Sequence, residues 1–221
     1  MKKVVAVVFV LAVMGAAALV GVISMQPAQL TVERSIVVDA TPADVAPWIS
    51  DLENVDAWSP WNARDPGMTK TSSEVTDQVG SWHAWDGNDE VGAGRQTIVR
   101  ITDPEGGDFE VEQALHFDRP FESDAKVLTS LHAMEEGTQV TWSMTTENDF
   151  FSKAFGLLVD MDAMLGADFE QGLAMLKPLA EASRAEREEA EEAAEAEEHE
   201  EEARLAAEEA ERLHNTGMGI R

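Results

Sequence analysis

Residues 69–147 carry the feature that constrains the fold most, because apolar and polar residues alternate there with a period of two. That period is the pattern of β-strands that bury one face. One face of the clearest segment is apolar apart from a single glutamine and consists of Phe109, Val111, Gln113, Leu115 and Phe117. The other face carries Glu110, Glu112 and His116. We therefore expect strands at 69–75, 81–86, 94–102, 108–117, 124–134 and 138–147.

Turn residues separate these strands, for example Gly87-Asn88 and Glu135-Glu136-Gly137. Short connections between consecutive strands are typical of an antiparallel meander. In the last strand Val140, Trp142 and Met144 share an apolar face. A sheet with one apolar face needs a covering layer.

The segment before the meander predicts one strand followed by two short helices. Residues 30–38 are rich in β-formers and alternate in part. Thr41-Pro42-Ala43-Asp44 is a helix start, with a capping Thr, Pro at the first helical position and an acid in the first turn. We expect helices at 44–49 and 52–58, the second of which ends before Pro60.

The segment after the meander predicts a long helix over residues 150–181. Its apolar residues recur every three or four positions at Leu158, Met161, Leu165, Phe169, Leu173 and Leu176. Gly166 and Gly172 interrupt the pattern, as glycines do where a backbone or a ligand comes close. Pro178 predicts a bend or an end. This helix would cover the apolar face of the sheet.

The N-terminus reads as a membrane signal. Lys2 and Lys3 precede residues 4–23, which contain no charge and are long enough to span a bilayer as a helix. We expect a single-pass anchor in the cell membrane, with the domain on the extracytoplasmic side. A cleaved signal peptide, with its small-residue site at Ala16-Ala17-Ala18, is the alternative and would leave a secreted domain.

Composition excludes several classes of function. The chain contains no Cys, so disulfides, thiolate metal sites and a cysteine nucleophile are absent. A formal net charge of −27, with no basic cluster, argues against a nucleic-acid partner. Residues 181–212 hold 15 Glu and 4 Arg, a charge of −11, while residues 28–180 carry −19. Salt adaptation or solubility would each account for an acidic body.

The organisation we predict is an anchor or signal at 1–27, a globular domain at 28–180 and an acidic tail at 181–221. The tail is rich in Glu and Ala, and its large aliphatics, Leu205 and Leu213, are too few for a coiled-coil seam. An exposed helix or a disordered extension fits this composition. We therefore expect deletion after Ser183 to leave the melting temperature nearly unchanged. The oligomeric state is left open.

A set of short motifs resembles the START-like (SRPBCC) superfamily, in particular its polyketide cyclase/dehydrase-like proteins with an N-terminal membrane segment. The motifs are Trp58-Ser59-Pro60-Trp61, Trp85-Asp86-Gly87-Asn88, Val91-Gly92-Ala93-Gly94-Arg95, Phe117-Asp118-Arg119-Pro120-Phe121, Gly137-Thr138-Gln139-Val140-Thr141-Trp142 and Gly166-Ala167-Asp168-Phe169-Glu170-Gln171-Gly172-Leu173. The resemblance implies an α+β helix-grip fold, in which a curved antiparallel sheet of about seven strands grips the long C-terminal helix. It also implies an apolar cavity between the two. The acidic tail and the acidic body depart from the family.

We predict that eight residues line this cavity: Trp85, Arg95, Gln113, Leu115, Trp142, Met144, Leu165 and Phe169. Large rings are common in apolar pockets. The alternative position for the Trp85 side chain is an outer face of the sheet, beside Gly87-Asn88. Arg95 would meet an acidic ligand group at the mouth or pair with a neighbouring acid.

The sequence points to no catalytic residue, metal or cofactor. Histidine is a common acid–base residue, but His83, His116 and His132 have no nucleophile or carboxylate at a meaningful spacing. His116 alternates with glutamates, so we expect it in solvent, and we expect the same of Asp168. Asp86-Gly87-Asn88-Asp89-Glu90 departs from the EF-hand pattern and reads as a hairpin turn.

The function that follows is binding of a hydrophobic small molecule or lipid by a membrane-tethered, exported domain. One alternative is a cyclase/dehydrase-like or hydrolase-like enzyme that uses the same cavity, which would need a polar acid–base pair inside. Another is a non-catalytic scaffold or stress-response protein with a filled core.

Overall fold

A computed structural model describes residues 2–102 and 108–217 of the chain. The helices are α1 (Lys2–Ser24), α2 (Pro42–Ser50), α3 (Leu52–Ala57), the 3-10 turn η1 (Pro60–Ala63), α4 (Phe150–Phe155) and α5 (Met161–Gly217). The strands are β1 (Gln29–Val38), β2 (Thr69–Ser72), β3 (Trp82–Asp86), β4 (Ala93–Ile101), β5 (Asp108–Arg119), β6 (Ser123–Met134) and β7 (Gly137–Glu147). Every expected strand and both short helices are present, with ends shifted by a few residues.

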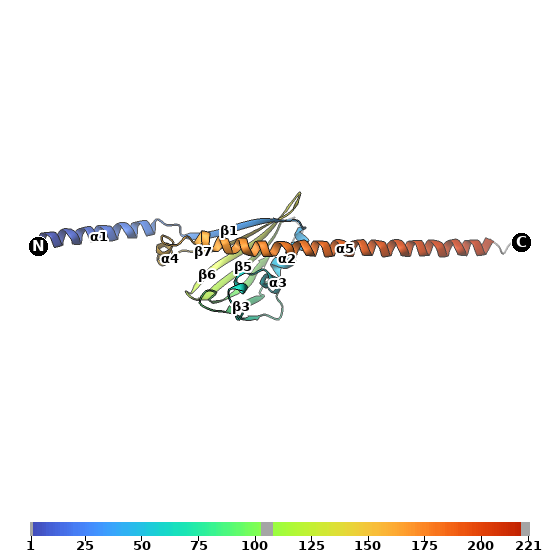
Figure 1. Cartoon of the computed structure of the whole chain (residues 1–221), viewed down its shortest axis with the longest axis horizontal. Helices are drawn as coiled ribbons and strands as arrows, with labels where there is room; N and C mark the ends of the chain where they lie inside the picture. The colour runs from blue at the N-terminus through green and yellow to red at the C-terminus, as the bar shows by residue number, and fades with distance from the viewer. Residues whose placement is uncertain (1, 103–107, 218–221) are drawn as a thin grey trace.

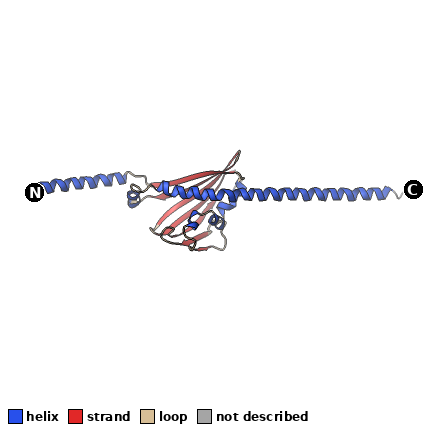
Figure 2. Ribbon diagram, in the orientation of Figure 1, coloured by secondary structure: helices blue, strands red, loops and turns tan. Residues whose placement is uncertain are grey.

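The seven strands form one curved antiparallel sheet in the order β1-β7-β6-β5-β4-β3-β2 (Figure 2). Strands β2 to β7 are a meander, as their short connections predict. β1 joins the far edge by pairing along its whole length with β7, where Val32 lies opposite Met144 and Ile36 opposite Val140. The α+β helix-grip fold expected from the sequence is thereby confirmed.

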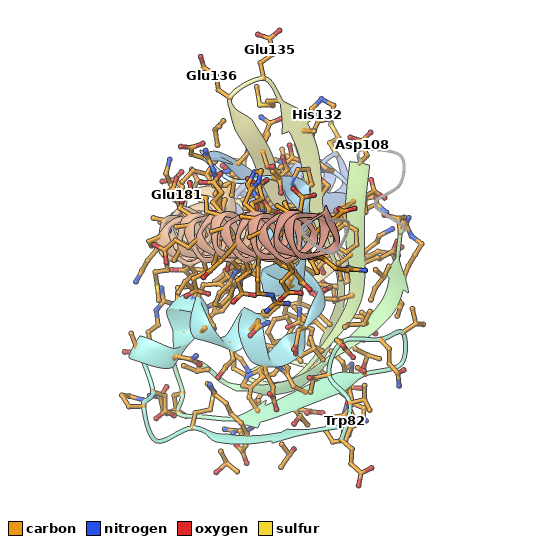
Figure 3. The ribbon with its side chains drawn as sticks, turned by 90° about the vertical axis from the view of Figure 1, so that its right-hand side faces the viewer. Trp82, Asp108, His132, Glu135, Glu136 and Glu181 are labelled. Carbon is orange, nitrogen blue, oxygen red and sulfur yellow. The ribbon has the colours of Figure 1, made fainter. Side chains whose placement is uncertain are left out.

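α5 crosses the concave face of the sheet, with α2 and α3 beside it (Figures 1 and 3). The core lies between these layers, because the inward positions of the strands and one face of α5 are both apolar. Leu173, Leu176 and Ala180 of α5 are buried there. α2 starts as predicted, with Thr41 accepting a hydrogen bond from the backbone N–H of Asp44 and the Asp44 carboxylate bonded back to Thr41.

The predicted single helix over residues 150–181 is wrong at both ends. It is two helices, because Asp149 caps the short α4 and Asp160 accepts a hydrogen bond from the N–H of Ala163 at the start of α5. Leu158 lies between them and is 86% exposed rather than in the stripe. α5 then runs through Pro178 without ending. The helix continues because packing and its remaining hydrogen bonds offset the bond that Pro178 cannot make.

The two glycines of α5 differ in what comes close to them: at Gly166 it is a side chain, and at Gly172 it is a side chain together with the backbone carbonyl of Trp58. A Cβ on Gly166 would clash with the guanidinium of Arg34, and one on Gly172 would meet the ring of Trp142. Arg34 donates to Glu170 Oε1 at 2.9 Å and to Asp162 Oδ2 at 3.0 Å. These ion pairs set how α5 lies along β1, and the missing side chain at Gly166 leaves room for them.

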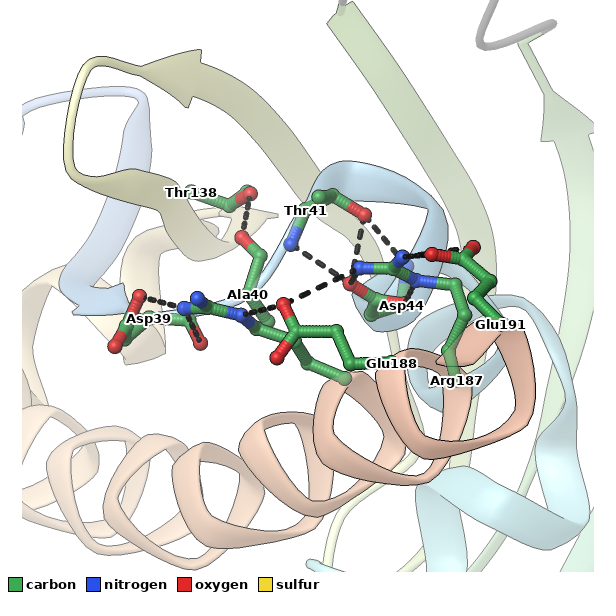
Figure 4. A network of polar contacts seen from close by, with 9 residues as sticks. Asp39, Ala40, Thr41, Asp44, Thr138, Arg187, Glu188 and Glu191 are labelled. Carbon is green, nitrogen blue, oxygen red and sulfur yellow. Dashed lines mark hydrogen bonds and ion pairs between the residues drawn. The ribbon is translucent and has the colours of Figure 1, made fainter. Parts of the chain in front are cut away.

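The part of α5 after Ser183 is joined to the body at its beginning (Figure 4). Arg187 Nε donates to Asp44 Oδ1 at 2.8 Å, and Arg184 pairs with Asp39. Burial by itself would raise the pKa of Asp44, but hydrogen bonds from Arg187 and Thr41 outweigh it, so the pKa is lowered. The structure therefore revises the expectation that everything after Ser183 is dispensable. Beyond this contact the helix projects away from the body (Figure 1).

α1 leaves the body at the opposite end from the projecting part of α5 (Figure 1). It touches α4, and most of its large apolar side chains from Phe9 onward are exposed. In the described residues, no helix combines the length and apolar character required to cross a membrane.

Candidate ligand-binding cavity

A cavity of about 450 Å³ lies beneath the first turns of α5. Its walls come from the inward faces of β2 to β7, from α3 and η1, and from the α5 residues Met164, Leu165, Asp168 and Phe169. Apolar and aromatic side chains predominate. η1 contacts α5 and contributes to the lining, so it forms part of the wall between the helix and the sheet.

Seven of the eight residues expected in the cavity line it: Trp85, Gln113, Leu115, Trp142, Met144, Leu165 and Phe169. The strand alternation places four of them, since side chains at every second position point to the same face. Trp85 adopts the inward of its two expected positions, with its ring 5.8 Å from that of Phe117.

Arg95 is the exception and lies outside the lining. Its guanidinium sits over the ring of Trp82, 4.1 Å from the ring centroid. In Figure 3 Trp82 lies in the lower part of the sheet, far from α5. Alternation explains the misplacement, because Gln96 is the inward residue of β4 and its neighbour Arg95 must point outward.

Aromatic rings form one wall of the cavity. Trp142 stacks on Phe169 at 4.2 Å, and the edges of Trp58 and Trp61 meet it at 4.9 and 5.8 Å. Trp58 is fixed by a 2.8 Å hydrogen bond from its indole N–H to the carbonyl of Trp48. Such edge and stacked contacts add to the stability that burial of the rings provides. The motif Trp58-Ser59-Pro60-Trp61 thus contributes two aromatic rings to the lining of the cavity.

Three uncharged polar side chains, those of His83, Gln96 and Gln113, are connected across the lining from β3 to β5. His83 Nε2 lies 3.1 Å from Gln96 Oε1, and the Gln96 amide donates to Gln113 Oε1. Burial lowers the pKa of His83, so the ring is neutral at pH 7. Because Gln96 Oε1 accepts, the His83 nitrogen facing it carries the proton. The sequence pattern had assigned only Gln113 to this region.

An ion pair also faces the cavity. The carboxylate of Asp168 is buried and accepts a hydrogen bond from Arg64. The expectation that Asp168 lies in solvent is wrong. A helical projection contains the signal, because Asp168 follows Leu165 by three residues and adjoins Phe169 on the inward face. Arg64, in a loop after η1, has no periodicity that would reveal it.

His116 and His132 lie on the surface. His116 Nδ1 is 2.7 Å from Asp124, which raises the pKa of that exposed ring, as expected for a solvent position. His132 Nδ1 is 2.6 Å from Asp108, at the other end of the β5–β6 pair (Figure 3). Within residues 2–102 and 108–217 no cluster of His, Asp and Glu has the arrangement of a metal site.

The turn between β3 and β4 is a hairpin loop, as predicted. The side chain of Asn88 accepts hydrogen bonds from the N–H groups of Glu90 and Val91. Asp65 accepts one from the N–H of Asn88. The carboxylates of this loop do not converge on a common point, so an ion-binding role has no support.

Comparisons with solved structures agree with this architecture. A hypothetical protein from Helicobacter pylori superposes with a TM-score of 0.52 at 8% identity, covering 68% of this chain and 88% of that one. The KanY protein gives 0.51 at 15% identity, covering 69% and 98%. A protein from Chromobacterium violaceum gives 0.49 at 16% identity, covering 71% and 99%. At these identities the likeness to the first two, whose TM-scores exceed 0.5, concerns the fold alone.

No curated protein matches the sequence. Residues 29–181 match the family described as polyketide cyclase / dehydrase and lipid transport. The matched segment begins at β1 and ends within α5, so it contains the sheet, the cavity and the gripped part of the helix. This chain therefore belongs to the polyketide cyclase/dehydrase and lipid transport family.

Proposed function

We propose that the domain binds a hydrophobic small molecule or lipid in the cavity beneath α5. The observation that carries the proposal is the cavity itself, about 450 Å³ with walls that are mainly apolar and aromatic. Ligand pockets of drug-sized molecules fall between about 300 and 1,000 Å³ and have such walls. Transfer of apolar ligand surface from water into this space is favourable by about 25 cal/mol per Å².

The test fills the cavity without touching its exterior. In Leu165→Trp the larger ring occupies space beside Phe169, and we expect it to abolish binding of the neutral fluorescent probe N-phenyl-1-naphthylamine. Leu158→Trp is the matched control, because it introduces the same ring at an 86% exposed position. It should bind the probe as the wild type does. Titrations follow probe fluorescence, with thermal melts of all three proteins.

Two results would contradict the proposal. One is a wild type that does not bind the probe at all. The other is binding by Leu165→Trp that equals that of the wild type, which would place the probe outside the cavity. Native mass spectrometry of protein purified from its own host then addresses the natural ligand, which would appear as a mass that Leu165→Trp lacks.

Catalysis in the same cavity is the weaker candidate. Its one support is that His83 and the carboxylate of Asp168 both line the space. However, Asp168 is paired with Arg64, and His83 is bonded to an amide rather than to a carboxylate that would make it a stronger base. A filled core, which the scaffold alternative requires, does not fit the cavity volume.

We further propose that the domain is tethered to the membrane and exported, as Lys2, Lys3 and the uncharged residues 4–23 predict. Exposed apolar side chains at the end of the domain next to α1 support this. The strand register brings the start of β1, the β5–β6 hairpin and the end of β7 to that end. Met25, Phe121, Phe151 and Leu158 there are each at least 80% exposed.

A tethered domain that presents apolar side chains beside the lipid would take up its ligand near the bilayer. Val91 and Pro120, which line the cavity, come from turns at this same end. Protease added to spheroplasts should digest the domain and leave the membrane-associated N-terminus. Full protection in intact spheroplasts would contradict export, and recovery in the soluble periplasmic fraction would favour the cleaved-signal alternative.

A further inference from the structure

Three neighbouring strands place unpaired polar atoms against the cavity. Gln113 of β5, Thr129 of β6 and Trp142 of β7 are 3%, 4% and 7% exposed, and all three line the cavity. Thr129 lies directly opposite Trp142 in the sheet. Gln113 is opposite Val127, two positions from Thr129 on the same inward face. We call these three residues the polar row.

Each member of the polar row has hydrogen-bonding capacity that the described part of the chain does not use. The Gln113 carbonyl accepts from Gln96, which leaves the Gln113 amide N–H groups as donors. Neither the Thr129 hydroxyl nor the Trp142 indole N–H has a side-chain or backbone partner among residues 2–102 and 108–217.

These atoms are open to the cavity rather than sealed in the core. Within the described residues, no fully enclosed side-chain nitrogen or oxygen lacks a hydrogen-bond partner. The unpaired atoms must therefore border on space, and each belongs to a residue that is more than nine-tenths buried and lines the cavity. A buried donor without an acceptor is costly, so such groups in a binding site indicate a bound partner.

The charges around the cavity decide which partner fits. The cations in the lining are already paired with carboxylates: Arg64 with Asp168, Lys70 with Asp56 and Arg119 with Asp86. An anionic group would enter without a counter-ion, and its desolvation would oppose binding. A neutral oxygen would satisfy the donors at no such cost.

We propose that the ligand is a hydrophobic molecule with a neutral carbonyl oxygen, which the polar row binds while the aromatic wall holds the hydrocarbon frame. This inference rests on the proposed function and specifies its ligand class. A pure hydrocarbon of the same shape leaves the donors unpaired, so the site discriminates against it.

The experiment uses three molecules that share one rigid ring frame: fluorene, 9-fluorenone and 9-fluorenecarboxylate. Binding to the full-length protein is measured by isothermal titration calorimetry. We expect the ketone to bind about tenfold more tightly than the hydrocarbon, as one or two net hydrogen bonds would give. The carboxylate should bind more weakly than the ketone.

Variants then assign the effect to the polar row. Thr129→Val keeps the side-chain shape and removes the hydroxyl, so the preference for the ketone should fall several-fold. Thr129→Ser retains the hydroxyl and should keep the preference. Gln113→Met provides a second, independent loss of a donor. Thermal melts of each variant show that a folded protein was compared.

The possible outcomes separate this inference from the function on which it rests. Equal affinities for fluorene and 9-fluorenone would overturn the carbonyl preference while leaving hydrophobic binding intact. Tightest binding of the carboxylate would overturn the preference for a neutral group. A preference that survives in both Thr129→Val and Gln113→Met would overturn recognition by the polar row as proposed, because two of its three residues would have no part in it. Binding of none of the three molecules would defeat the proposed function and this inference together.

Discussion

The space beneath α5 is filled in one half and hollow in the other. Toward the middle of the helix, Leu173, Leu176 and Ala180 are no more than 1% exposed and pack against β-branched residues of the sheet and of α2. One to three turns earlier, Leu165 and Phe169 face the cavity instead. We call these the packed half and the hollow half.

The two halves differ in the shapes of the side chains that face the helix. Compact residues such as Val38, Val45 and Val140 belong to the buried core with the packed half and do not line the cavity. Large aromatic rings line the cavity at the hollow half, among them Trp61, Trp85 and Phe117. Trp142 on Phe169 marks the boundary between them. The same helix thus supplies stability with one segment and a binding surface with the other.

The largest expected difference between the halves is the cost of shortening a leucine. Leu176→Ala leaves a void in close-packed surroundings, so we expect it to lower the free energy of unfolding by about 2–5 kcal/mol. Leu165→Ala enlarges space that is already open and should cost distinctly less. Urea denaturation followed by tryptophan fluorescence measures both. Equal costs would mean that the two halves are packed alike.

Enlarging the same two side chains gives the next largest effect. Leu176→Trp overpacks its surroundings, a change that typically costs about 1–3 kcal/mol. In Leu165→Trp the ring enters the cavity, and the free energy of unfolding should change by less than that. Melting curves of the pair provide the comparison. A Leu165→Trp protein as destabilised as Leu176→Trp would show that the hollow half cannot accept a ring.

Truncations test the contact beyond the packed half. Ending the chain after Ser183 removes Arg187 from Asp44 and Arg184 from Asp39, so the melting temperature should fall by less than in Leu176→Ala. Ending it after Glu191 keeps both arginines and should leave the melting temperature unchanged. If the two truncated proteins have the same melting temperature at pH 7, the arginine contacts do not stabilise the body.

This contact also has a defined pH dependence. The folded pKa of Asp44 lies below its ordinary value of 3.8, so its stabilisation is present above that value and is lost as pH falls through the folded pKa. The difference between the two truncated proteins should therefore shrink in strongly acidic solution. If the difference in melting temperature between the two truncated proteins is constant from pH 7 to pH 3, it arises from helix packing rather than from the Asp44 ion pair.

The smallest expected effect belongs to His83 in the hollow half. Burial lowers its folded pKa below the ordinary value of 6.5, so the unfolded chain binds the proton more readily and stability declines as pH falls below 6.5. In His83→Gln this contribution disappears. The pKa of His116 is raised instead, but its contribution to stability is the same in the wild type and in His83→Gln and cancels in the comparison. Melts between pH 7.5 and 5 should be flatter for the variant, and parallel curves would contradict neutral burial of His83.

The sequence by itself determined the sheet, the start of α2 and most of the inward positions. The reason is that these depend on local rules: a period of two along β5 and β7, turn residues between strands, and the cap formed by Thr41 and Asp44. Seven of the eight residues assigned to the cavity line it because alternation fixes the face of a side chain before its neighbours are known. Their contact with a ligand stays a prediction.

Only the tertiary structure decided the rest, because it depends on residues far apart in the chain. Arg64 meets Asp168, His83 reaches Gln113 through Gln96, and α5 passes through Pro178 into a segment held by Asp44. The cavity itself is a space left over when rings from several strands and η1 meet one helix. No local pattern encodes such a space, since its volume is the difference between what the backbone encloses and what all the side chains fill.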